Sequence, residues 1–115
     1  MRDRRRAERH GRAAETVAAW WLRLHGWRIL GRRVRTPVGE VDLVAKRGRT
    51  VAFVEVKARG TEADLDLAVD HHRLRRVASA AEHLLARYPA EVHRIDVMLV
   101  ARGRLPRHLR NVWYG

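Results

Sequence analysis

Residues 39–59, which read Gly-Glu-Val-Asp-Leu-Val-Ala-Lys-Arg-Gly-Arg-Thr-Val-Ala-Phe-Val-Glu-Val-Lys-Ala-Arg, decide the fold of this chain. Two mostly apolar runs, Glu40 to Lys46 and Val51 to Arg59, flank the glycine-containing turn Arg47 to Thr50, which is the pattern of a β-hairpin. A four-residue loop at this turn places Asp42 directly across from Glu55 on one face of the sheet. A loop one residue longer or shorter would put them on opposite faces.

Strand alternation also places Lys57 on the same face as Glu55. Lysine is rare in this chain, because Lys46 and Lys57 are the only lysines among 25 basic side chains. Facing carboxylates repel each other without a cation, and oxygen ligands completed by water suit Mg²⁺ or Mn²⁺ better than zinc. We therefore predict a metal site with Asp42 and Glu55 as ligands, beside which Lys57 would orient a water or neutralise charge on a phosphate.

Each of these residues taken alone also fits an ordinary strand or turn. Asp42 could belong to a turn, and Glu55 and Lys57 could face solvent on a half-exposed strand. The apolar residues Val51, Phe53 and Val56 favour a buried strand, and this favours the site over the simpler interpretation.

The flanking segments predict an α/β domain with a mixed sheet, in which an antiparallel meander precedes a helical crossover to a parallel fourth strand and two long helices flank the sheet. Apolar periodicity, strand-like alternation and turn residues define the expected elements: a helix from Ala7 to His25 closed by Gly26, strands from Trp27 to Arg35 and from His93 to Ala101, a turn at Pro37 to Gly39, a polar loop from Gly60 to Asp66, a helix from Leu67 to Tyr88, and a short terminal strand within Arg102 to Gly115.

Two further carboxylates have expected partners. Glu15 lies at the edge of the apolar face of the first helix and leans inward, where an unpaired carboxylate is costly, so we expect a positive group or a metal-bound water beside it. Asp96 follows Arg94 on the same face of a strand, which predicts a structural ion pair. Glu40 is a weaker candidate metal ligand, since an acid beside Gly39 more often stabilises the turn.

Length and composition limit the organisation of the chain. Its 115 residues fit one small domain spanning residues 1–115, with a basic and flexible segment at residues 1–10. Because there is no cysteine, disulfides and thiolate metal sites are excluded. No long hydrophobic run is present, so a cytoplasmic location is the expectation.

The net charge of +12 and the pI near 11.6 favour a polyanionic partner, nucleic acid and DNA in particular before a membrane surface. Biased coding explains arginine in place of lysine but not the excess of basic over acidic residues. Trp20 and Trp21 are expected in the core or in a dimer contact, and Trp113 and Tyr114 are weak candidates for stacking on a base. The expected phosphate contacts are Arg35, Arg59, Arg73 and Arg76.

Five motifs together resemble the YraN family of small bacterial proteins over about residues 11–113. The resemblance implies a restriction-endonuclease-like fold, similar to archaeal Holliday-junction resolvases, with a PD-(D/E)xK nuclease centre. Arg33 stands where the family often has asparagine, and Arg73 where lysine is usual. The motifs are Gly11-Arg-Ala-Ala-Glu15, Gly39-Glu-Val-Asp-Leu-Val44, Phe53-Val-Glu-Val-Lys-Ala-Arg59, Ala68-Val69 and Arg94-Ile-Asp-Val97, and the implied roles are metal-binding acid for Asp42, second ligand for Glu55, catalytic lysine for Lys57 and helix acid for Glu15.

Three functions follow as hypotheses. The first is a Mg²⁺-dependent (or Mn²⁺-dependent) endonuclease that hydrolyses phosphodiester bonds of DNA, branched or structured DNA included. The second is a non-catalytic nucleic-acid-binding protein that keeps the nuclease fold, and the third and least supported is a basic adaptor for a protein or membrane surface. Resolvase-like nucleases commonly pair, so a homodimer is compatible with the resemblance.

Overall fold

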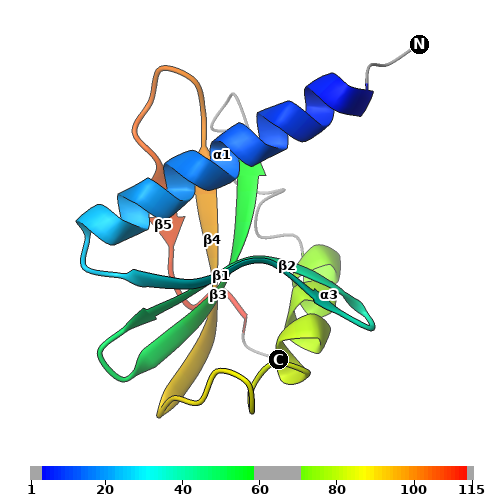
Figure 1. Ribbon diagram of the computed structural model, residues 1–115, viewed down its shortest axis with the longest axis vertical. Coiled ribbons are helices and arrows are strands. Elements are labelled where there is room, and N and C mark those ends of the chain that lie inside the picture. Colours follow the sequence, from blue (N-terminus) through cyan, green and yellow to red (C-terminus); the bar gives the residue numbers. More distant parts are fainter. Residues whose placement is uncertain (1–3, 59–70, 114–115) are drawn as a thin grey trace.

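The computed structural model describes the backbone of residues 4–58 and 71–113, with the side chains of residues 11–58 and 72–113. Within these residues two helices flank a sheet of five strands in the order β1-β2-β3-β4-β5 (Figure 1). This confirms the expected α/β class and mixed sheet. The elements are α1 (Arg4–Leu24), β1 (Arg28–Thr36), β2 (Gly39–Arg47), β3 (Thr50–Ala58), α3 (His71–Glu82), β4 (Val92–Val100) and β5 (Arg107–Leu109).

The sheet combines a meander with a crossover, as the sequence predicts. Strands β1, β2 and β3 pair antiparallel, β4 lies parallel to β3, and β5 returns antiparallel to β4. A parallel neighbour requires a long connection, and the segment that contains α3 supplies it. Strand β4 is mostly buried because its side chains pack into hydrophobic clusters on both faces of the sheet.

The second hairpin differs from the prediction in its loop length. Arg47 pairs with Thr50, so the loop contains only Gly48 and Arg49 instead of four residues. Gly48 has φ +60, the left-handed conformation that two-residue hairpin loops require and glycine adopts without strain. Since two and four are both even, the predicted register survives the correction.

Helix α1 ends at Leu24, and Gly26 just beyond it has φ +88. The Trp27 amide donates to the Leu22 carbonyl at 2.9 Å, so the carbonyls of the last turn are satisfied as the chain leaves the helix. The expected C-cap is confirmed.

Helix α3 ends at Glu82, six residues before the predicted end at Tyr88. The amides of His83 and Leu84 donate to carbonyls three residues earlier, at 3.1 and 2.9 Å, which tightens the chain into turns before Pro89. The apolar periodicity continues through Leu84, so it does not reveal where the α-helix stops. The predicted loop from Gly60 to Asp66 and the helix start at Leu67 lie outside the described residues.

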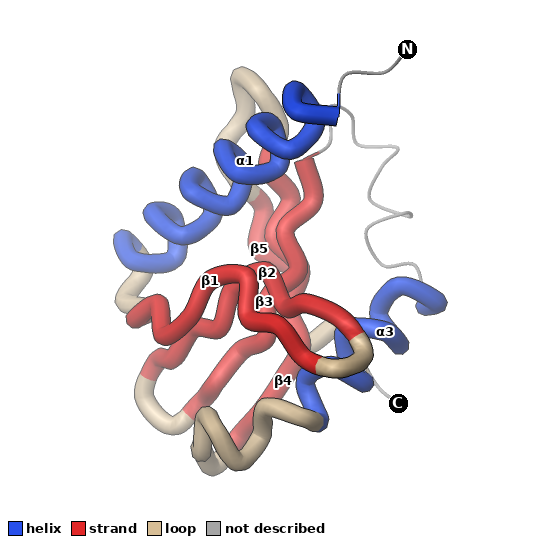
Figure 2. Tube along the Cα trace, turned by 45° about the vertical axis from the view of Figure 1, so that its right-hand side comes forward, coloured by secondary structure: helices blue, strands red, loops and turns tan. Residues whose placement is uncertain are grey.

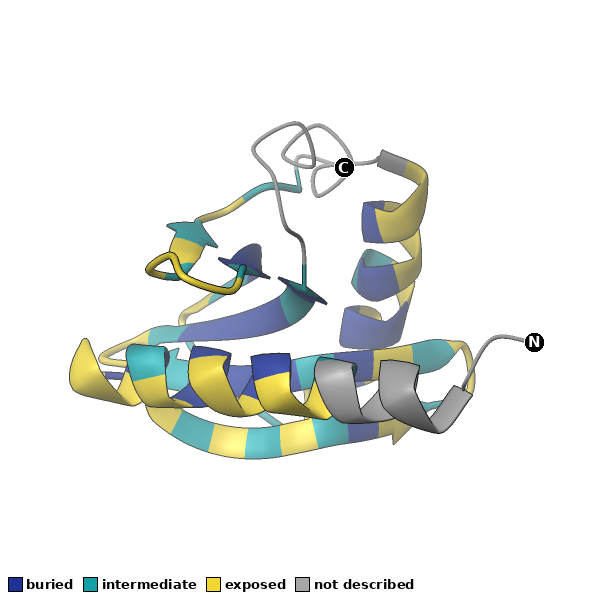
Figure 3. Cartoon of the chain, turned by 90° about the horizontal axis from the view of Figure 1, so that it is seen from above, coloured by how far each residue is buried: buried dark blue, intermediate teal, exposed yellow. Residues whose placement is uncertain are grey.

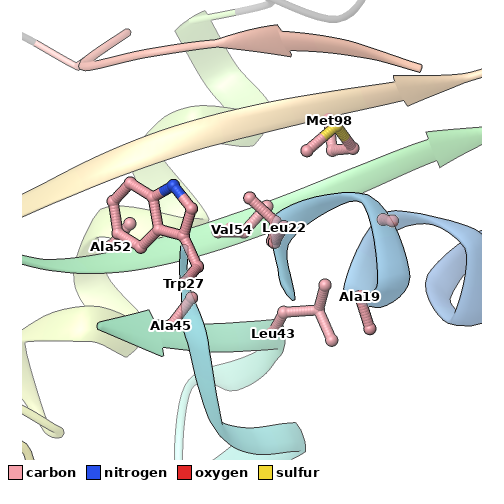
Figure 4. Packing of buried hydrophobic residues seen from close by; sticks show 9 residues of the cluster. Ala19, Leu22, Trp27, Leu43, Ala45, Ala52, Val54 and Met98 are labelled. Atoms are coloured by element: carbon pink, nitrogen blue, oxygen red, sulfur yellow. The ribbon is translucent and has the colours of Figure 1, made fainter. Parts of the chain in front are cut away.

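The two helices cover opposite faces of the sheet. On one face Leu22 of α1 packs with Leu43, Val54 and Met98, as Figure 4 shows together with Trp27. On the other face Phe53 lies in one cluster with Ala80 and Leu84, which belong to α3 and the turn after it. Successive strand residues point to opposite faces, so the buried positions alternate between the two helices. Figure 3 shows that the helices are buried on the sides that face the sheet and exposed on their outer sides.

Asp96 joins β4 to the C-terminal segment. Its fully buried carboxylate accepts from Arg94 Nε at 3.0 Å, from the Asn111 amide at 2.9 Å, and lies 2.7 Å from His108 Nε2. Burial opposes ionisation of Asp96, but these partners together hold its pKa below the ordinary value. The predicted Arg94–Asp96 ion pair is confirmed, and His108 and Asn111 extend it.

The tryptophans lie in different environments. Trp20 is 57% exposed, with the Arg23 guanidinium 5.1 Å from its ring centroid, so of the two expected places only the dimer contact is left for it, whereas Trp21 packs against the core. Trp113 is half-buried beside the cluster that contains Leu74 and Ile95, and its stacking on a base stays a prediction. Tyr114 lies outside the described residues. Neither described helix is long and apolar enough to cross a membrane.

Candidate active site

The candidate site forms where β2 and β3 diverge. Strand β2 pairs with β1 as far as Gly39, but its pairing with β3 begins only at Leu43 and Val54. One step further the same register places Asp42 across from Glu55, which is the predicted relation. Figure 2 shows β2 and its hairpin leaning toward α3, while β3 continues beside β4.

Where the backbone pairing of β2 and β3 stops, the Asp42 side chain accepts a hydrogen bond from the backbone of β3. The Val56 amide donates to Asp42 Oδ2 at 2.8 Å. Burial nevertheless raises the pKa of Asp42 to about 6, against the lowering effect of the Val56 amide, and the nearby charges of Glu15, Glu55 and Glu40 raise it further. Among the described residues Asp42 forms no ion pair, so the Val56 amide is its only direct hydrogen-bond partner, while the Arg33 charge acts on it from a longer distance.

Glu55 and Lys57 form a buried ion pair on the face of β3 that α3 covers. Lys57 Nζ lies 2.9 Å from Glu55 Oε1, and Arg73 Nη2 of α3 lies 3.6 Å from the same oxygen. Lys57 is only 3% exposed. The second carboxylate oxygen, Glu55 Oε2, is buried and accepts no hydrogen bond from the described residues, which leaves an oxygen able to bind a further cation.

Glu15 approaches the site from α1. The glutamate is 9% exposed, and its Oε1 accepts from Arg33 Nε at 2.7 Å. The sequence-based expectation of a positive group beside Glu15 is confirmed. Its partner could not be foreseen from the residues, since Arg33 belongs to the first strand and lies 18 positions after Glu15 in the sequence.

A hollow of about 140 Å³ opens beside the diverging strands. Glu55 lines it from β3 and Arg73 and Arg76 line it from α3. Two predicted phosphate contacts are therefore brought to the candidate site, one helical turn apart. The remaining lining residues are Val38, Gly39, Glu40 and Val77.

The other predicted contacts lie apart from this hollow or cannot be placed. The Arg35 side chain is 90% exposed, and its Nε lies 3.8 Å from Glu40 Oε2, whose side chain is 42% exposed. This position suits a contact with an extended partner, and it leaves Glu40 in a surface ion pair of small energetic weight. Arg59 lies outside the described residues.

The donor set fits a hard divalent cation held by few protein ligands. No three His, Asp or Glu side chains in the described parts of the chain are arranged as a preformed metal-binding group. Mg²⁺ commonly keeps several waters and binds through one or two carboxylates plus substrate phosphate, so a complete protein cage is not required. Asp42, which forms no ion pair with a described side chain, and the unpaired oxygen of Glu55 are the two ligands that this chemistry would use.

The fold and the site define a small α/β protein that gathers three acids and a buried lysine where two strands of a mixed sheet diverge. The chain belongs to the uncharacterised protein family UPF0102, whose family model matches residues 14–100. This is the YraN family that the sequence motifs resemble.

Full-length relatives support the assignment. The chain is 69% identical to a UPF0102 protein of Sphingopyxis alaskensis, with 93% of this chain and 94% of the relative aligned. It is 64% identical to one of Rhizorhabdus wittichii, with 100% and 99% aligned, and 59% identical to one of Erythrobacter litoralis, with 93% and 94% aligned.

Proposed function

We propose that this protein is a Mg²⁺-dependent or Mn²⁺-dependent endonuclease that hydrolyses phosphodiester bonds of DNA, and that its fold is of the restriction-endonuclease type. One observation carries the proposal. Asp42, which forms no ion pair with a described basic side chain, lies across from Glu55, which keeps an unpaired buried oxygen, and Lys57 lies against the same carboxylate.

The residues divide the chemistry between them. A bound divalent cation would polarise the phosphodiester and make a water more acidic. Asp42 and Glu55 would hold that cation, and the Lys57 ammonium would donate to the phosphate oxygen on which negative charge develops. Arg73 and Arg76 would bind the phosphates on either side of the scissile bond, because both line the hollow beside Glu55.

Substituting the proposed ligand and the lysine tests this function. We expect Asp42→Asn and Lys57→Gln each to lower the rate of DNA cleavage at least ~100-fold, because each removes a charge that acts in the transition state. Affinity for DNA should change little, since the arginines remain. Cleavage of labelled linear, flap and four-way-junction DNA with Mg²⁺ or Mn²⁺ measures the first quantity, and binding at the same salt concentration measures the second.

The chain offers a matched control. Lys46→Gln removes the only other lysine, which lies on β2 at the end far from Asp42 and should leave cleavage unchanged. Full activity of either Asp42→Asn or Lys57→Gln would rule out the proposed centre.

A second function is favoured by the ion pair between Lys57 and Glu55. A lysine that is 3% exposed and 2.9 Å from a carboxylate can serve to stabilise the sheet alone, in a nucleic-acid-binding protein without turnover. A calorimetric titration with Mg²⁺ and Mn²⁺ in the presence of DNA separates the two functions. Absence of metal binding at millimolar concentration would favour the non-catalytic protein.

A further inference from the structure

Arg33 has a backbone conformation that is rare for a residue with a side chain. Its φ is +51, in the left-handed region, and among the described non-glycine residues only Asn111 shares a positive φ. The register on either side, Arg32 with Leu43 and Val34 with Val41, places Arg33 across from Asp42. Arg33, Asp42 and Glu55 therefore stand in one row across three neighbouring strands.

The Arg33 side chain is directed to the acids. Its Nε donates to Glu15 Oε1 at 2.7 Å, and this hydrogen bond is the main reason that the pKa of Arg33 is raised, with smaller contributions from the charges of Glu15, Glu40 and Asp42. Glu55 has Lys57 and Arg73 as cations. Arg33 is therefore a basic group on the Glu15 and Asp42 side of the site.

We propose that Arg33 is the counter-cation of Glu15 and Asp42. Its guanidinium balances their negative charges, as a bound divalent cation would otherwise do. The inference rests on the proposed function in one respect, namely that a metal ion binds beside Asp42. The guanidinium lowers repulsion among the acids while no metal is bound, and it disfavours metal binding because a fixed positive charge repels the incoming cation. Arg33 thus sets how tightly the site holds metal before substrate arrives.

Asparagine is the informative replacement because it tolerates a positive φ better than other residues. We expect Arg33→Asn to bind Mn²⁺ about tenfold more tightly than the original protein in calorimetric titrations at low ionic strength, as removal of one nearby charge predicts. Arg33→Lys keeps the charge and should stay near the original affinity. Arg32→Asn removes the same charge from the adjacent residue, whose guanidinium bonds Thr16, and should change the affinity less than about twofold.

A metal-free measurement tests the same role independently. Arg33→Asn should lower the urea midpoint of unfolding at pH 7.5, and it should lower it less when Asp42→Asn is already present, because the charge that Arg33 offsets has then been removed. Equal shifts in both backgrounds would overturn the counter-cation role.

The outcomes separate this inference from the proposed function. Unchanged or weaker Mn²⁺ binding by Arg33→Asn overturns the inference while the original protein binds metal. If no variant binds Mn²⁺ yet the urea midpoints show the expected dependence on Asp42, the nuclease centre is overturned and the counter-cation role stands. Tighter Mn²⁺ binding by Arg33→Asn, together with urea midpoints that depend on Asp42 as expected, supports both the counter-cation role and the nuclease centre.

Discussion

Asp42 behaves differently from an ordinary aspartate because burial disfavours its charged form and three other acids lie near it, while the Val56 amide is its only described hydrogen-bond donor. A folded pKa of about 6, against the usual 3.8, means that the folded protein keeps a proton on this carboxyl in a pH range where the unfolded chain releases it. Asp42 therefore lowers the free energy of unfolding as pH rises through this range, by up to ~3 kcal/mol at neutral pH.

The loss of stability with rising pH predicts how Asp42→Asn changes the free energy of unfolding. The amide keeps an acceptor for the Val56 N–H but carries no charge, so the variant should be more stable than the original protein at pH 7 and close to it at pH 4. Urea unfolding of both proteins at the two pH values measures the difference. The lowered pKa of Asp96 acts in the opposite direction, but it is present in both proteins and cancels in the comparison. A difference independent of pH would contradict the raised pKa.

At the same scale, the sequence predicts part of the candidate site. Alternation and an even hairpin loop are enough to place Asp42 across from Glu55, because strand geometry has a strict period of two. The Arg33–Glu15 pair could not be predicted in the same way, because it depends on a left-handed backbone at Arg33 that neither charge nor periodicity indicates. The hydrogen bonds of Asp96 to His108 and Asn111 likewise depend on how the C-terminal segment returns to β4.

Gly31 and Gly11 differ in the space that surrounds their Cα atoms. Gly31 of β1 follows an irregularity in the pairing with β2, and a Cβ at this position would lie 2.7 Å from Val34 Cγ2 and 2.9 Å from the Tyr88 hydroxyl. Gly11 lies inside α1, where a Cβ would meet nothing within 4 Å. The close approach at Gly31 brings β1 against the segment after α3.

We therefore expect opposite effects from the same substitution. Gly31→Ala should lower the free energy of unfolding by about 1–3 kcal/mol through overpacking, whereas Gly11→Ala should raise it by up to ~1 kcal/mol through helix propensity. Chemical denaturation of the two variants gives both values. Destabilisation by Gly11→Ala would show that this glycine has a role that the helix geometry does not require.

The elements themselves follow from the sequence more closely than their ends do. The order of strands, the parallel β4 and the C-cap at Gly26 all follow from periodicity and turn chemistry. The end of α3 at Glu82 does not, because apolar residues such as Leu84 face the sheet from a turn as well as from a helix. Local hydrogen-bond geometry, which the residue pattern leaves open, decides that boundary.

Over the whole molecule the dominant property is the net charge of +12. If arginines supply the affinity for DNA, the binding constant should fall by orders of magnitude between about 50 and 200 mM salt, since each phosphate contact releases counterions. Arg76→Gln should reduce the slope of log affinity against log salt by about one, because Arg76 lines the hollow.

Arg104→Gln provides the comparison. Arg104 carries the same charge on the exposed loop between β4 and β5 and does not line the hollow, so the slope should be nearly unchanged. Fluorescence anisotropy with one DNA duplex over a series of salt concentrations measures the slopes of the original protein, Arg76→Gln and Arg104→Gln. Equal slopes for all three proteins would exclude Arg76 from the bound phosphates.

The separation of β2 from β3 at Asp42 has a consequence for how this scaffold can diversify. Beyond that residue the first hairpin is paired only within itself and rests on α3 through Val34 and Val41, and its turn supplies Val38 and Gly39 to one wall of the hollow. Insertions or deletions at Pro37 and Val38 would reshape that wall without disturbing Asp42, Glu55 and Lys57, which lie on the inner strands β2 and β3. Evolution can in this way vary what the hollow admits while the charged framework is inherited unchanged.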